Sequence, residues 1–154
     1  MTKSRDIANS TSTLDVDGGT IKLDGNYPVG TNNVALGDAA LDSNVSGGYN
    51  TAAGAFTLTS STTANANTAV GYQALLDNTT GAANTSLGYL SLANNTTAEK
   101  NVAVGVETLE TNTTGQYNTA LGTHALRLNT TANNNTAVGY QAGYSNTASA
   151  EGTF

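Results

Sequence analysis

Polar and apolar residues alternate along this chain in short runs that return at a constant step of 17 residues. Residues 67–71 are representative and read Asn-Thr-Ala-Val-Gly, with the asparagine as position one of the repeat. Seven such repeats, here called coils, begin at Asn33, Asn50, Asn67, Asn84, Asn101, Asn118 and Asn135. A short constant period predicts a β-solenoid, because each unit can bury its apolar side only against its neighbours.

Alternation over the first five positions predicts one short β-strand per coil. In the third coil, one strand face carries Thr68 and Val70 and the other carries Ala69. We expect the larger side chains at position four to fill the interior of the solenoid, with Ala53 replacing them in the second coil. The predicted core residues of this row are Leu36, Val70, Leu87, Val104, Leu121 and Val138.

Glycine closes the predicted strand at position five of every coil. These corner glycines are Gly37, Gly54, Gly71, Gly88, Gly105, Gly122 and Gly139. A residue without Cβ at every corner indicates either a positive φ or a close approach of two backbones. Both reasons concern geometry rather than catalysis.

The second half of each coil supplies another apolar row, the leucines at position nine. This row of predicted core residues consists of Leu41, Leu58, Leu75, Leu92, Leu109 and Leu126, whereas the last coil has Gly143. The surrounding residues suit one helical turn or a second short strand equally well. Asn-Thr-Thr at 78–80, 95–97, 112–114 and 129–131 matches the N-glycosylation pattern, but we interpret these runs as stacked turns.

A coil of 17 residues encloses a thin core, and parallel strands usually have both faces covered. We therefore expect the small alanine face to pack against further copies of the chain, as a parallel homotrimer about a long axis, although the pattern does not fix the number three. The predicted trimer contacts are Ala35, Ala52, Ala69, Ala103, Ala120 and Ala137. At a strand spacing of about 4.8 Å, seven coils form a shaft roughly 33 Å long.

Residues 1–30 differ from the repeats and are expected to form a separate segment, with the solenoid shaft over 31–154. Two alternating runs, 13–16 and 20–23, flank Asp17-Gly18-Gly19 and predict a β-hairpin or two linked strands. This segment either caps the solenoid or attaches it to a larger assembly, and both roles are compatible.

Charge and composition narrow the possible functions. Charged residues make up 10% of the chain, the net charge is −6, and cysteine is absent. Nucleic acid and anionic membrane surfaces call for a basic patch, so neither is an expected partner. No stretch has the apolar length of a secretion signal or a membrane span, so we expect synthesis in the cytoplasm.

Candidate chemistry is sparse, and we expect neither an enzyme nor a bound metal or cofactor. His124 is the only histidine, and Glu107 occupies the equivalent position one coil earlier. Catalysis by a histidine dyad requires a positioned partner, and Glu107 and Glu110 face no second acidic pair. Tyr72, Tyr89 and Tyr140 share position six, where packing is favoured over a row that stacks against carbohydrate.

The repeat 67–75 with the turn 78–81, together with 2–8 and 19–27, resembles tail-fibre proteins of marine bacteriophages such as cyanophages and pelagiphages. The repeats are more distantly similar to the heads of trimeric autotransporter adhesins. The resemblance implies a trimeric virion fibre, attached to other tail proteins through residues 1–30 and directed at a host polysaccharide or receptor. The adhesins need a signal peptide and a membrane anchor, and we expect neither in this sequence. The resemblance to the phage family is therefore favoured.

Two other functions compete with the fibre. One is a bacterial cell-surface adhesin or glycan-binding repeat protein. The other is ice binding, which threonine rows on a solenoid suggest, although the side-by-side threonines here differ from regular Thr-x-Thr spacing.

Overall fold

The computed structural model describes residues 14–16, 19–21, 32–147 and 149–154, and all regular structure in these residues is β. β1 (Leu14–Val16) and β2 (Gly19–Ile21) pair antiparallel, with Leu14 opposite Ile21 and Val16 opposite Gly19. The hairpin predicted near the N-terminus is therefore present. Its turn at 17–18 lies outside the described residues.

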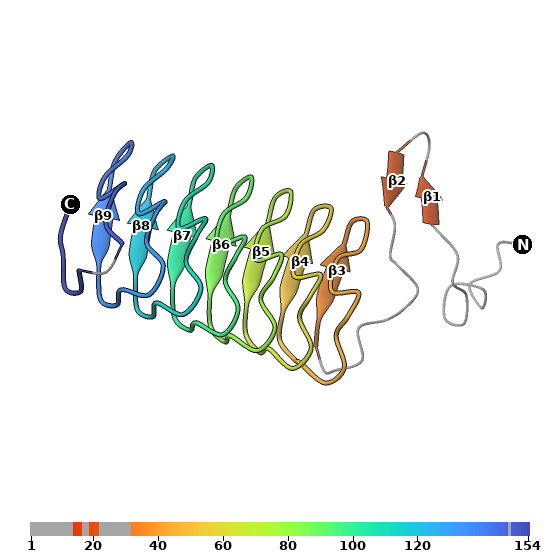
Figure 1. The fold of residues 1–154 in the computed structure, drawn as a ribbon. Coiled ribbons are helices and arrows are strands. Elements are labelled where there is room, and N and C mark those ends of the chain that lie inside the picture. Colours follow the sequence, from red (N-terminus) through yellow and green to blue (C-terminus); the bar gives the residue numbers. More distant parts are fainter. Residues whose placement is uncertain (1–13, 17–18, 22–31, 148) are drawn as a thin grey trace, which may run out of the picture.

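Seven short parallel strands form the second sheet, one per coil and in sequence order (Figure 1). They are β3 (Val34–Leu36), β4 (Thr51–Ala53), β5 (Thr68–Val70), β6 (Thr85–Leu87), β7 (Val102–Val104), β8 (Thr119–Leu121) and β9 (Thr136–Val138). Each residue pairs with the residue 17 positions on, as Thr51 does with Thr68 and Thr68 with Thr85. The predicted β-solenoid is confirmed.

The strand faces are inverted relative to the sequence-based expectation. The alanines at position three, predicted as trimer contacts, point into the coil, and Ala52, Ala69, Ala103, Ala120 and Ala137 are completely buried within one chain. Ala35, in the first coil, is partly buried against the same core. The prediction that these alanines form contacts between chains is therefore wrong.

The position-four residues predicted as core lie on the outside instead. Leu36, Leu87, Leu121 and Val138 are exposed, and Val70 and Val104 are only partly buried. The physical reason is space, because the position-nine leucines already fill the narrow interior and leave room only for methyl groups opposite them. That leucine row is buried from Leu41 to Leu126, so this part of the core prediction is confirmed.

Two rows of asparagine complete the interior and were not anticipated as buried. In the first row, the Asn67 backbone N–H donates to Asn50 Oδ1 at 3.0 Å. Asn67 Nδ2 donates to Asn50 Oδ1 at 3.2 Å and to the Gly81 carbonyl oxygen at 2.9 Å. Since the amide is fully paired, its burial carries no penalty for a lost hydrogen bond. Asparagine at position one of all seven coils was the signal for this row.

The second half of each coil contains neither the helical turn nor the second strand that the sequence allowed. Residues at positions seven and nine adopt positive φ, as Gln73 (54°) and Leu75 (53°) show. A non-glycine residue in this conformation costs about 1–2 kcal/mol and cannot continue a right-handed helix. Hydrogen bonds to the next coil hold the segment instead, including one from Leu75 N to the Ser91 carbonyl oxygen at 3.1 Å.

The corner glycines combine both features that their sequence pattern indicated. Their φ angles lie between 130° and 141°. A Cβ added to Gly71 would also collide with the backbone of Gly88 in the next coil. Gly139 has a φ of 130°, close to the 133° of Gly71, but its added Cβ would meet no atom within 4 Å.

Candidate functional surfaces

The outer sheet face of the solenoid is uncharged and carries exposed apolar side chains. We define it as the residues at positions two and four of β3–β9. Large apolar side chains on it are 37–60% exposed, namely Val34, Leu36, Leu87, Leu121 and Val138. The threonines of position two, such as Thr68 and Thr136, are exposed beside them. None of its fourteen positions carries a charge.

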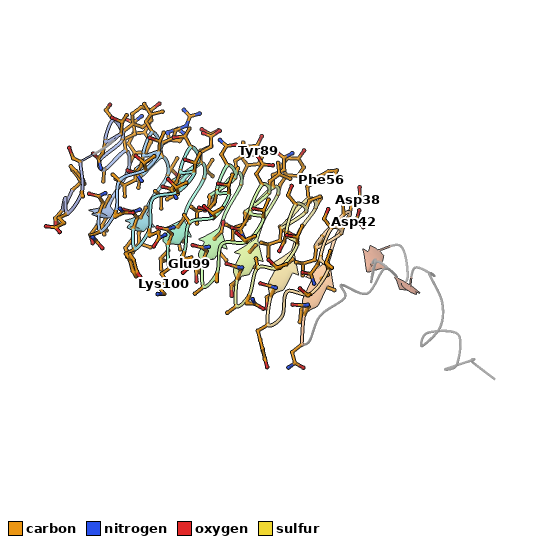
Figure 2. All side chains as sticks on the ribbon, turned by 60° about the horizontal axis from the view of Figure 1, so that its bottom comes forward. Asp38, Asp42, Phe56, Tyr89, Glu99 and Lys100 are labelled. Carbon is orange, nitrogen blue, oxygen red and sulfur yellow. The ribbon has the colours of Figure 1, made fainter. Side chains whose placement is uncertain are left out.

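A row of aromatic side chains borders this face at positions six and seven. Tyr72 and Tyr89 stack with ring centroids 5.6 Å apart and planes at 11°, and Phe56 meets Tyr72 edge to face at 5.9 Å. Figure 2 shows Phe56 and Tyr89 along the same edge of the solenoid as Asp38 and Asp42. Because the tyrosine faces turn toward each other, they serve packing between coils, and a sugar ring would have no free face between them.

Tyr140 belongs to the same position but has a different environment. It is 72% exposed, and its ring centroid lies 6.1 Å from that of His124, with the planes tilted by 43°. The stacked pair thus contains only two of the three tyrosines in the predicted row. Tyr140 keeps a ring available to solvent.

A charged cluster next to Tyr140 brings together the residues singled out for chemistry. His124 Nε2 lies 3.1 Å from Glu107 Oε2, so the expected neighbourhood of these two residues is confirmed. Arg127 contacts the same Glu107 oxygen at 3.0 Å and donates from Nε to Glu110 Oε2 at 2.6 Å. It also donates to the Tyr144 hydroxyl at 3.2 Å.

The partners of Arg127 explain the electrostatics of this cluster. Its hydrogen bonds to Glu110 and then to Tyr144 raise the pKa of Arg127 above its ordinary value, so the guanidinium stays charged. His124 Nδ1 is buried and has no hydrogen-bond partner among the described residues. A histidine base is normally oriented through its second nitrogen, and this support is missing here. The contacts of His124 and Arg127 with Glu107 connect the fifth and sixth coils.

A second cation lies on the opposite edge of the solenoid, where Figure 2 places Glu99 and Lys100. Lys100 Nζ donates to the Tyr117 hydroxyl at 3.2 Å and lies 5.0 Å from the centroid of that ring. The hydrogen bond raises the pKa of Lys100. Charged side chains therefore lie along both edges that flank the uncharged sheet face.

The Asn-Thr-Thr runs are stacked turns, as interpreted from the sequence, with the asparagine inside and the second threonine exposed. Asn78, Asn95, Asn112 and Asn129 are completely buried. Asn95 Nδ2 donates to Asn78 Oδ1 at 2.8 Å, and the Thr79 hydroxyl donates to the Thr96 carbonyl oxygen at 3.0 Å. Because these amides point inward and are paired, an enzyme cannot reach them as glycan acceptors in the folded chain.

Within the described residues, no group of three or more His, Cys, Asp or Glu side chains could hold a metal ion. A search of the same residues finds no helix long and apolar enough to cross a membrane. Most of residues 1–30 lie outside the described residues, so their attachment role stays a prediction. Comparison with protein-family models, with curated proteins and with solved structures finds no match to this chain.

Proposed function

We propose that this chain is the shaft of a fibre-like virion appendage, a phage tail fibre that serves host attachment without an enzymatic step. The supporting observation is the unbroken register of the seven parallel strands. Each coil donates and accepts backbone hydrogen bonds across the step of 17 residues, as from Thr68 N to Asn84 O and from Gly71 N to Ala53 O. Such continuity produces a stiff rod whose length grows with coil number.

In this proposal, copies of the chain assemble as a parallel homotrimer. Residues 1–30 attach the fibre to other tail proteins, and the outward end approaches a host polysaccharide or receptor. The protein is made in the host cytoplasm and functions in the virion.

The test is immunogold electron microscopy of phage particles whose genome encodes this chain, with antibodies raised against residues 32–154. Labels on a tail appendage, together with the chain in the mass spectrum of purified particles, support the proposal. Particles that contain no trace of the chain overturn it. A phage encoding a different fibre is the control for antibody specificity.

A glycan-binding surface protein is the second candidate, and the exposed ring of Tyr140 beside the charged cluster favours it. Exposed aromatic rings commonly supply the apolar part of a polar binding site. Binding of the intact chain to an array of bacterial polysaccharides supports this candidate only if Tyr140→Ala abolishes it and Tyr89→Ala does not.

A further inference from the structure

We propose that the outer sheet face is the surface on which a second copy of this chain docks, in the same orientation. The inference deepens the proposed fibre, because it identifies the contact through which the copies assemble. The outer sheet face takes the place of the alanine face as the predicted contact between chains, because the alanines are buried inside each coil.

The first reason is that the face is a parallel sheet with one side uncovered. Parallel sheets occur almost only with both faces covered, and their strands then read as apolar on both sides. Here Ala69 and its equivalents cover the inner face, while Leu87 and Leu121 remain exposed on the outer one. Contiguous exposed apolar surface of this kind marks an interaction site.

The second reason is charge. The chain carries a net charge of −6, so two copies repel each other unless their contact avoids the acidic groups. The outer sheet face has no charged side chain in any of its seven strands. The charges around it lie on its two edges, represented by Asp38 on one and Glu99 with Lys100 on the other (Figure 2).

The third reason is periodicity, which identifies the occupant as a copy of the chain. The face repeats one strand after another, at a spacing of about 4.8 Å, over roughly 29 Å. A partner must match that spacing along its whole length to pack without voids. Another copy of the same solenoid has the same strand spacing. A symmetry axis along the solenoid brings equivalent rows of the two copies together.

Area decides how far the contact extends. The three-residue strands are about 10 Å long, so the strand face alone covers roughly 300 Å². A stable interface buries about 800 Å² on each partner. The contact therefore includes the uncharged stretch of the flanking position-six row in the third to fifth coils, where Tyr72, Tyr89 and Val106 are exposed.

Cysteine cross-linking tests the proposal directly, because the natural chain has no cysteine. The variants are Leu87→Cys at the middle strand β6, Leu36→Cys at the first strand β3, and Thr97→Cys as a control in an exposed turn. A disulfide needs Cα atoms within about 7 Å. We expect L87C and L36C to form covalent dimers under mild oxidation of the native protein, and T97C to stay monomeric on non-reducing gels.

Three results would overturn the proposal. The first is a monomeric mass for the wild-type chain by light scattering at about 100 μM. The second is an oligomer in which L87C cross-links no faster than T97C, which places the contact elsewhere. The third is cross-linking of L87C without L36C, which means that the copies run antiparallel.

A double lysine variant tests the same face independently, in case the cysteine variants misfold. Leu87→Lys combined with Leu121→Lys should yield a monomer whose circular dichroism spectrum matches that of the wild type. Thr97→Lys with Thr114→Lys adds the same charge in exposed turns and should stay oligomeric. If the double lysine variant remains oligomeric, the face is not the contact.

These outcomes separate the interface from the proposed fibre function. If L87C cross-links but virions do not contain the chain, the interface is supported and the phage assignment is overturned. If virions are labelled but cross-links form only at other surfaces, the fibre function is supported and this interface is overturned.

Discussion

The ring of Phe154 occupies the space that a leucine side chain fills in the preceding coils, directly over Gly143. A Cβ built on Gly143 would lie 2.9 Å from Phe154 Cδ2 and 2.8 Å from Leu126 Cδ2. The segment holding Phe154 pairs with β9, since Thr136 bridges Thr153 and Val138 N donates to the Phe154 carbonyl oxygen at 3.0 Å. Phe154 thus stands in the row of interior alanines, and the missing leucine makes room for it.

This pair predicts compensation between two substitutions. Phe154 is 46% exposed, so F154A should lower the free energy of unfolding by about 1–2 kcal/mol. G143L should also destabilise, because the new side chain collides with the ring. The double variant G143L/F154A should regain at least about 1 kcal/mol relative to the sum of the single effects.

Urea unfolding, followed by circular dichroism on all four proteins, measures this coupling. Gly143 has a φ of 60°, close to the 48–55° of the leucines in its row, so the backbone already suits a leucine there. Additive effects of the two substitutions would show that the ring does not fill the leucine site.

The corner glycines predict a large difference between two chemically identical substitutions. G71A should cost at least about 3 kcal/mol, because the added methyl group collides with Gly88 and forces adjacent coils apart. G139A should cost only about 1–2 kcal/mol, because Gly139 has nearly the same φ as Gly71 but its added methyl group meets no collision. Thermal unfolding of both variants separates close approach from backbone strain, and equal losses would contradict the collision.

Ser61 interrupts the second asparagine row and predicts a stabilising substitution. Its hydroxyl is buried without a hydrogen-bond partner in the described part of the chain, between the coils that hold Asn44 and Asn78. S61N should restore the amide row and raise the free energy of unfolding by about 1 kcal/mol. The reverse change at an intact site, N95S, removes the bond to Asn78 and should lower it by a similar or larger amount. Chemical unfolding of both variants tests the pair, and a loss of stability in S61N would show that the site cannot hold an amide.

Positive φ at ordinary residues predicts that glycine stabilises this fold at selected sites. Ala83 is exposed with a φ of 57°, whereas its neighbour Ala82 is not among the residues with positive φ. A83G should be neutral or stabilising by up to about 1 kcal/mol, since glycine adopts this conformation without strain. A82G should destabilise by about 0.5–1 kcal/mol through its greater unfolded-state entropy. Melting temperatures that fall equally for both would refute this reasoning.

The solenoid, its step of 17 residues and the place of each strand could be predicted before the structure, because these depend on periodicity along the chain. The sequence also located the corner glycines and the leucine row, whose residue types tolerate few alternatives. Likewise, equal spacing placed Glu107 beside His124.

The strand face that points inward could not be predicted in this way and was identified from the three-dimensional fold. Alternation separates Ala69 from Val70 but does not say which is inside, and hydrophobicity alone favours the larger residue. In a coil this narrow, volume outweighs hydrophobicity, since leucine and paired asparagines leave space only for methyl groups. The positive φ of Leu75 escaped prediction for a related reason: hydrogen bonds to the next coil hold that conformation, and propensities within one coil do not include them.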